Sequence, residues 1–134
     1  MLKANFITPQ EAVSMIRDGD TVCTIGMTLV SASETVLKAI EKSFLETGKP
    51  NHLTLLHSCG QSDRKDGIQH FAHEGLVTRI IGSHWGLQPK WMAMISENKA
   101  EAYCLPQGQI AQLYGAMARG LPGKLSKVGL GTFV

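Results

Sequence analysis

The stretch Leu53-Thr54-Leu55-Leu56-His57, followed by Ser58-Cys59-Gly60, decides the fold. A short apolar run that ends at polar residues and a glycine is typical of a buried strand. Upstream, the run Thr21-Val22-Cys23-Thr24-Ile25 ends at Gly26 in the same way. Between the two runs, apolar residues recur at helical spacing, namely Val36, Leu37, Ile40 and Phe44. The sequence therefore predicts a strand, a helix and a second strand in that order.

Capping signals mark where the helices begin. Ser31-Ala32-Ser33-Glu34 has the spacing of a capping box, and Gly48 closes the helix that it would open. Thr8-Pro9-Gln10-Glu11 has the same spacing with proline at the first helical position, and Gly19 ends that helix. We therefore expect one helix before the first strand and one between the first two strands.

The alternation of elements continues downstream. By the same criteria we predict a polar loop over 58–67, a short helical stretch over 68–74 and a strand over 76–81. A helix that carries Leu87, Trp91, Met94 and Ile95 follows, and then a strand over 102–105. The chain continues with a helix that carries Ile110, Leu113, Tyr114 and Met117 and a last strand over 127–130.

Strands that alternate with helices indicate an α/β fold, because parallel strands need crossovers and the helices supply them. We predict an open, mainly parallel sheet with flanking helices, within one domain over residues 1–134. In such sheets the ligand site lies at the carboxyl ends of the strands. The glycines that follow the predicted strands, Gly26, Gly60, Gly82 and Gly108, fall at that edge.

Composition excludes several classes of protein. Of the 134 residues, 43% are hydrophobic and 18% charged, which suits a folded domain and not a disordered chain. A net charge of +2 gives no basic patch for nucleic acid or an anionic membrane, and no apolar run approaches the ~18 residues of a membrane span. The N-terminus lacks the apolar region of a signal peptide. Three scattered cysteines without a CxxC pair are typical of reduced thiols, so we expect a cytoplasmic protein.

Single motifs yield no complete catalytic set. His70 and His73 stand three apart, as in a helical metal site, but no third ligand follows at a useful spacing, so we predict no metal site and favour a packed or hydrogen-bonded pair. Gly129-Leu130-Gly131 lacks the rest of a dinucleotide fingerprint. Cys59 with His57 would need spatial contact to act as a nucleophile and base.

Two further motifs leave alternatives open. His84-Trp85-Gly86 could line a ligand site, or the tryptophan could anchor a loop on the core, which is more common. Glu74 could act as a general base or nucleophile, although a carboxylate in a capping or pairing role is the more ordinary interpretation.

Several stretches together resemble family I coenzyme A transferases, above all the single-chain acetate/propionate type. These stretches are Phe71-Ala72-His73-Glu74-Gly75-Leu76-Val77, Gly82-Ser83-His84-Trp85-Gly86, Glu97-Asn98-Lys99-Ala100-Glu101-Ala102-Tyr103, Leu105-Pro106-Gln107-Gly108 and Val128-Gly129-Leu130-Gly131-Thr132-Phe133-Val134. The last resembles the family segment G-[IL]-G-T-F-[VI]. The resemblance covers almost the whole chain, and five motifs in the right order are specific.

The resemblance implies a Rossmann-like domain and an acyl-CoA:carboxylate CoA-transferase that moves CoA between short-chain carboxylates of the acetate, propionate and acetoacetate class. It also implies a glutamyl-CoA thioester, with the glutamate in the second half of the enzyme. We therefore expect residues 1–134 to be the N-terminal part of an alpha-type domain, incomplete at its C-terminus and without a catalytic residue of its own. The alternatives are an acyl-CoA hydrolase and a non-catalytic fragment or assembly piece.

The expected acyl pocket includes Gly26, Gln107 and Gly108 by their position after strands. Gly129 and Gly131 join it through their match to the family's glycine segment. The resemblance implies acyl-CoA and a short-chain carboxylate as substrates, coenzyme A itself as a substrate, and no tightly bound cofactor. We expect the remaining part of the enzyme as a partner, a homo-oligomer, and no nucleic acid or membrane partner.

Overall fold

The computed structural model describes residues 4–132 of the chain and contains helices and strands in alternation. The elements in chain order are α1 (Pro9–Ser14), β1 (Thr21–Thr24), α2 (Glu34–Thr47), β2 (Leu53–His57), the 3-10 helix η1 (Gly67–Phe71), β3 (Val77–Gly82), α3 (Pro89–Ser96), β4 (Glu101–Cys104) and α4 (Gln107–Ala118). The predicted α/β class is confirmed.

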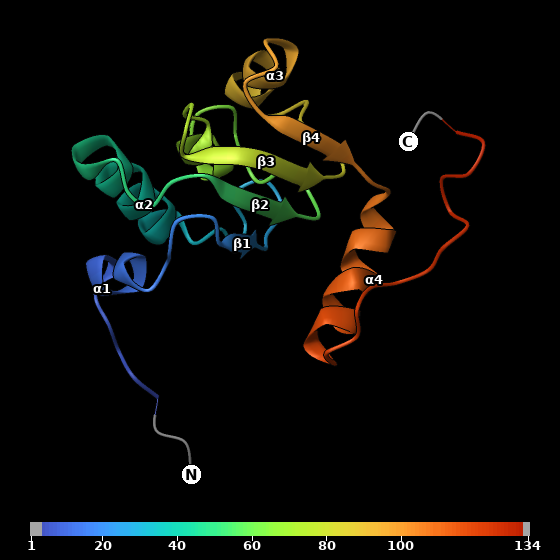
Figure 1. The fold of residues 1–134 in the computed structure, drawn as a ribbon, viewed down its shortest axis with the longest axis horizontal. Coiled ribbons are helices and arrows are strands. Elements are labelled where there is room, and N and C mark those ends of the chain that lie inside the picture. The colour runs from blue at the N-terminus through green and yellow to red at the C-terminus, as the bar shows by residue number, and fades with distance from the viewer. Residues whose placement is uncertain (1–3, 133–134) are drawn as a thin grey trace.

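The strands form one sheet in the order β1-β2-β3-β4, and every neighbouring pair is parallel (Figure 1). The register places Val22, Leu55, Ile80 and Ala102 side by side across the sheet. These residues belong to the hydrophobic core or pack against it. Helices α2, η1 and α3 each contribute two residues to the same core, so these helices cover that face.

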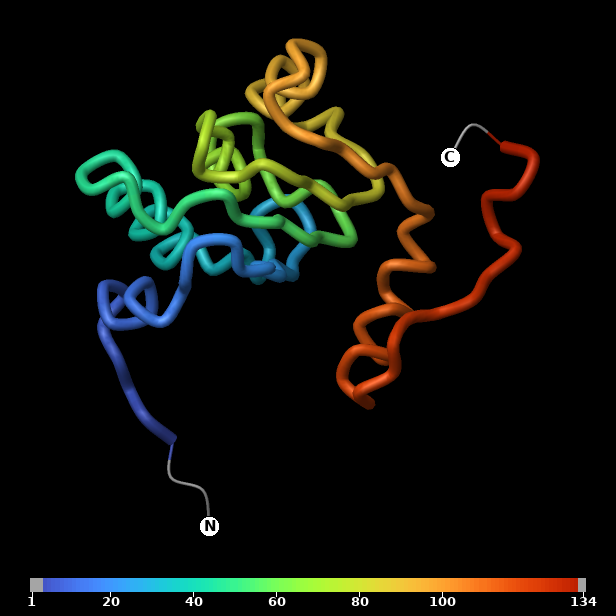
Figure 2. The backbone as a smooth tube through the Cα atoms, viewed as in Figure 1, coloured from blue at the N-terminus to red at the C-terminus, as the bar shows by residue number. Residues whose placement is uncertain are grey.

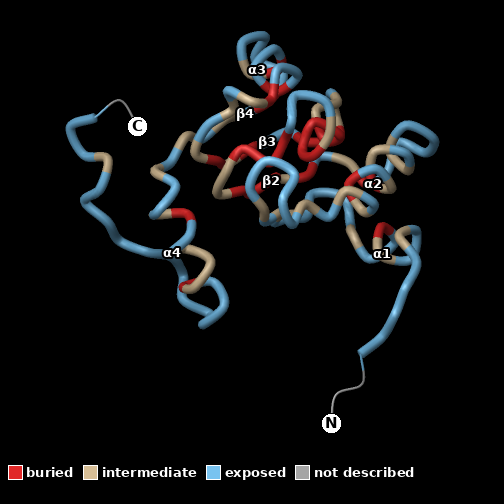
Figure 3. Tube along the Cα trace, turned by 180° about the vertical axis from the view of Figure 1, so that it is seen from behind, coloured by how far each residue is buried: buried red, intermediate tan, exposed pale blue. Residues whose placement is uncertain are grey.

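The core lies between the sheet and the helices that follow β1, β2 and β3 (Figure 3). Its largest fully buried side chains are Trp91 of α3, Phe71 of η1 and Ile40 of α2. The Trp91 indole N–H donates to the Ile68 carbonyl over 2.8 Å, which joins α3 to η1. One layer of helices thus packs on one side of the sheet.

The opposite face of the sheet is less covered within the described residues. The register aligns Cys23, Leu56, Ile81 and Tyr103 there. Leu56 is buried, whereas Cys23 is exposed and Tyr103 keeps 46% of its surface. Apolar side chains on this face therefore remain in contact with solvent.

Helix α4 lies beyond the carboxyl ends of β2 and β3, and the segment after it runs away from the sheet (Figures 1 and 2). Ile110 is fully buried on the inner side of α4. Burial raises the pKa of Tyr114 to about 12, with Cys23 of β1 adding to the shift. A helix of this chain therefore packs against the sheet edge where a ligand site was expected.

Three sequence predictions about elements are wrong. Helix α1 ends at Ser14, with Met15 as its C-cap, and not at Gly19. Ser31 does not open a capping box, because its backbone is left-handed (φ 63°) and the helix begins only at Glu34, after Ser33. The expected strand over 127–130 is a turn within an extended segment, where no strand of the described sheet lies beside it. By contrast, the Thr8–Glu11 capping box is confirmed, with both reciprocal bonds present.

Candidate active site

The loop between β1 and α2 folds back on itself at the carboxyl edge of the sheet. The Met27 N–H donates to the Val30 carbonyl over 3.1 Å, and the Val30 N–H donates back over 2.9 Å. Gly26 has φ +141°, and a Cβ there would lie 2.8 Å from the Val30 oxygen. Glycine at this position is therefore required by closure of the loop itself.

The loop of residues 58–61 follows β2, beside the loop of β1. Ser83, in the loop after β3, donates from its hydroxyl to the Ser58 carbonyl over 2.7 Å. His57 Nδ1 lies 2.8 Å from the Cys59 carbonyl, so the ring donates from Nδ1. The first two carbonyl groups of the loop are thus held from two directions.

The next two carbonyl groups of this loop are held as well. Thr28 donates its N–H to the Gly60 carbonyl over 3.1 Å, and Ile68 of η1 donates to the Gln61 carbonyl over 2.9 Å. The Gln61 side chain in turn donates to the Thr24 carbonyl over 2.7 Å. Every carbonyl from 58 to 61 is therefore occupied, and the loop is fixed to the ends of β1, β2 and β3 together.

His57 is a buried neutral histidine beneath this loop. Its side chain has no exposed surface, and a Cβ on Gly82 would overlap its ring. Desolvation lowers the pKa of His57 to about 4. The ring thus stays uncharged at neutral pH and donates steadily to the loop.

Gln107 and Gly108 open α4 just past the end of β4, and both are exposed. The Leu105 N–H donates to the Gly82 carbonyl over 2.9 Å, which ties the start of this segment to β3. A Cβ on Gly108 would meet nothing within 4 Å, so no contact in the described chain requires glycine there. Gln107, Gly108 and the Gly26 loop therefore share the carboxyl edge, at its opposite ends.

A mostly apolar groove of about 230 Å³ lies beside Gln107, between the start of α4 and the segment after it, but neither Gln107 nor Gly108 is among its lining residues. It is lined by Leu105, Pro106, Gln109, Ile110, Leu113, Lys124, Ser126 and Val128. Gly129 and Gly131 lie just beyond it, in a turn with φ 97° and 76°, and neither joins the loops of the sheet edge. The residues Phe133 and Val134 of the glycine segment lie outside the described part of the chain.

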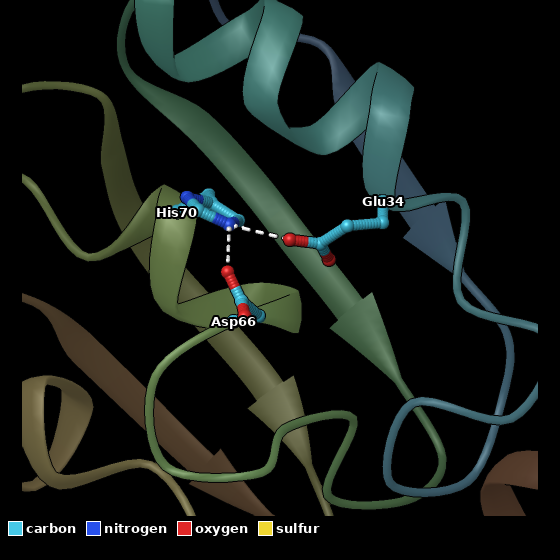
Figure 4. Close-up of side chains that lie close together, drawn as sticks. All are labelled: Glu34, Asp66 and His70. Atoms are coloured by element: carbon cyan, nitrogen blue, oxygen red, sulfur yellow. Dashed lines mark hydrogen bonds and ion pairs between the residues drawn. The ribbon is translucent and has the colours of Figure 1, made fainter.

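A cluster of charged side chains joins α2 to η1 (Figure 4). His70 Nε2 lies 2.7 Å from Glu34 Oε1 and 3.4 Å from Asp66 Oδ1, while Nδ1 lies 2.5 Å from Glu41 Oε2. Two of these carboxylates, Glu34 and Glu41, come from α2, whereas Asp66 stands only four residues before His70. The Lys38 ammonium group, however, already lies 3.2 and 3.3 Å from the Glu34 and Asp66 oxygens, so a cation of the chain itself pairs with both carboxylates.

The other candidate residues take structural positions. Glu74 is exposed before the amino end of β3 and pairs with Lys99 over 3.7 Å, away from the carboxyl edge. His57 contacts the carbonyl of Cys59 and gives no sign of a thiol–imidazole pair. Trp85 packs against the core, as the anchoring interpretation predicted.

Sequence reasoning missed three side chains of this edge: Gln61, Ser83 and Gln88. Each lies in or after a loop that follows a strand, which was the available signal. Gln61 and Gln88 are fully buried, and a polar residue in a loop is ordinarily expected to face water.

The parallel sheet, with loops fixed at its carboxyl edge and a groove beside α4, has the architecture of α/β proteins, a class that binds ligands at that edge. Residues 6–134 match the family model described as Coenzyme A transferase. The chain belongs to the coenzyme A transferase family.

Named relatives agree with this assignment. The chain is 40% identical over 132 residues to caffeate CoA-transferase of Acetobacterium woodii, covering 98% of this chain and 25% of the relative. It is 36% identical over 130 residues to acetate CoA-transferase YdiF of Escherichia coli K12, covering 96% of this chain and 24% of the relative. The chain thus spans about a quarter of the length of these relatives.

A solved structure of the YdiF acyl-CoA transferase from Escherichia coli O157:H7, described as a thioester complex with CoA, superposes with a TM-score of 0.88. The identity is 36%, and the match covers 96% of this chain and 27% of that chain. The fold expected from the resemblance is therefore confirmed. The described residues contain no helix long and apolar enough to cross a membrane.

Proposed function

We propose that this chain is the N-terminal part of an acyl-CoA:carboxylate CoA-transferase that moves CoA between short-chain carboxylates. The observation that carries the proposal is the family match over residues 6–134, together with relatives named as acetate and caffeate CoA-transferases. Acyl-CoA and a carboxylate are the substrates, and coenzyme A enters as a substrate rather than as a bound cofactor.

The chemistry needs a nucleophile that this chain is not expected to supply. A glutamate carboxylate attacks the acyl-CoA carbonyl and releases CoA thiolate, leaving an acyl-glutamyl anhydride. The thiolate then attacks the glutamyl carbonyl, which forms a glutamyl-CoA thioester and releases the first carboxylate. A second carboxylate reverses both steps. Such covalent catalysis divides one hard acyl transfer into easier ones.

The groove beside Gln107 is consistent with a chain that binds the acyl group while the nucleophile comes from the rest of the enzyme. None of its described lining residues is an aspartate or glutamate. Its apolar walls and its volume of about 230 Å³ suit a short acyl chain, since sites for drug-sized ligands measure ~300–1,000 Å³. In the proposal, Gln107 and Gly108 border the acyl group, with Gly26, Gly129 and Gly131 shaping the surrounding loops.

The chain alone is expected to be inactive and to need the rest of the enzyme as a partner, in a homo-oligomer. A cytoplasmic location is part of the same proposal and is supported by three free cysteines.

The test uses the full-length enzyme with acetyl-CoA, with and without propionate. We expect propionyl-CoA to form only when the carboxylate is present, with little free CoA released. Release of free CoA at the same rate without an acceptor would instead identify an acyl-CoA hydrolase, and no reaction with any short-chain carboxylate would overturn the proposal.

A further inference from the structure

On the backbone of residues 58–61, hydrogen-bonding capacity is left only on the donor side, while the Gln61 side chain keeps an unpaired amide oxygen, Oε1. All four carbonyl groups are occupied, as described above. The N–H groups of Cys59, Gly60 and Gln61 donate to no acceptor among residues 4–132. A row of free backbone donors is a ready site for an anionic oxygen.

A second, independent observation is the side chain of Gln88. It is fully buried, yet neither its amide nitrogen nor its amide oxygen has a hydrogen-bond partner within the described chain. A Cβ built on Gly60 would lie 2.8 Å from Gln88 Nε2. The unpaired amide therefore lies against Gly60 of the loop, and an unpaired buried polar group is costly unless a ligand satisfies it.

His84 approaches the same glycine from the solvent side. Its Nε2 also lies 2.8 Å from the Cβ position of Gly60, and Ser83 Oγ lies 3.1 Å from its Nδ1. His84 is exposed, and Ser58 and Cys59 are half-buried, so the loop can be reached from solvent on this side. Glycine at position 60 is what lets both side chains approach the backbone.

We propose that the 58–61 loop, Gln88 and His84 form the binding site for the carboxylate group of the acid that accepts CoA. This inference rests on the proposed function. N–H donors from the backbone, an amide and an imidazole would hold the carboxylate oxygens without a lysine or arginine, so that the carboxylate is oriented but still free to react with the enzyme-bound CoA ester.

The test measures steady-state kinetics of the full-length enzyme with acetyl-CoA and propionate. Gln88→Met removes the amide at nearly constant volume, His84→Ala alters an exposed side chain, and Gly60→Ala places a methyl group between the two. We expect each to raise the KM for propionate about tenfold, the usual effect of losing one hydrogen bond to a charged group. The KM for acetyl-CoA should change less, because its carbonyl carries no charge.

The control is Gly86→Ala, in the same loop as His84, where a Cβ meets nothing within 4 Å. It should keep both KM values. If Gly60→Ala fails to fold, Gln88→Met and His84→Ala decide the question. The site is overturned if both keep the wild-type KM for propionate while melting at the wild-type temperature.

A binding measurement separates this inference from the proposed function. Calorimetric titration of the wild-type enzyme with propionate alone should show binding that Gln88→Met weakens about tenfold. If the enzyme transfers no CoA but this difference is present, the function fails and the site stands. Equal binding by both proteins, or none by the wild type, contradicts the site.

Discussion

At the scale of single residues, His57 shows how burial fixes the state of a side chain. It sits beneath the loop that follows its own strand, with Nδ1 bonded 2.8 Å away to the Cys59 carbonyl and the ring packed on Gly82. A charged imidazolium would lose its hydration there. The loop therefore depends on the neutral form.

This dependence predicts a loss of stability in mild acid. Desolvation lowers the pKa of His57 to about 4 in the fold, from 6.5. As pH falls from 6.5 to 4, the unfolded chain takes up a proton that the folded chain does not, so the free energy of unfolding falls by roughly 3 kcal/mol. Urea unfolding of the protein between pH 7 and 4.5 measures this fall in the free energy of unfolding.

The matched variant is His57→Asn, whose amide can still donate to the Cys59 carbonyl but does not titrate. It should unfold with a flatter pH dependence than the wild type over this range. Parallel pH curves for the two proteins would show that His57 takes up its proton in the folded state as easily as in the unfolded one.

At the scale of elements, a hydrogen-bond network between carboxylates and histidines fixes α2 to η1. The Glu41 carboxylate of α2 lies 2.5 Å from His70 Nδ1 and 2.7 Å from His73 Nε2. Burial alone would raise the pKa of Glu41, but the hydrogen bonds to the two histidines outweigh it and lower the pKa. Glu34 of the same helix accepts from the Gly67 N–H over 3.0 Å. The two elements are thus joined at the first turn of α2 and again at Glu41.

We predict that Glu41→Gln lowers the free energy of unfolding at pH 7 by about 1–3 kcal/mol, because it removes the charge that the two histidines share. The control is Glu46→Gln on the same helix, whose exposed carboxylate lies 3.8 Å from Lys42 and should cost about 0.5 kcal/mol or less. Urea unfolding at pH 7 compares them. Equal effects of the two substitutions would contradict the prediction.

The sequence predicted the sheet better than the connections between its elements. Runs such as Leu53–His57 are buried strands because a short, continuous apolar run that ends at polar residues and glycine is buried on both faces of a sheet. The predicted capping box at Ser31 does not form because the loop places Ser31 in a left-handed conformation. The Glu34 carboxylate instead bonds the Gly67 N–H and His70, which lie 33 and 36 residues away. Gln88 was missed because its approach to Gly60 depends on contacts distant in sequence.

At the scale of the whole molecule, one face of the sheet carries Tyr103 and Ile81 with little cover, and Leu105 keeps 38% of its surface nearby. The chain spans about a quarter of its relatives' length. We therefore expect another part of the enzyme to cover this face and to bring the nucleophilic carboxylate to the edge that holds Gln107.

The most direct test of this account locates the covalent intermediate. The full-length enzyme is incubated with acetyl-CoA, digested, and its peptides are searched by mass spectrometry for a glutamate bearing CoA. We predict an adduct on a glutamate outside residues 1–134, formed equally by the Glu74→Gln variant. An adduct on a peptide within residues 1–134, lost in Glu74→Gln, would contradict the account, as would turnover without any adduct.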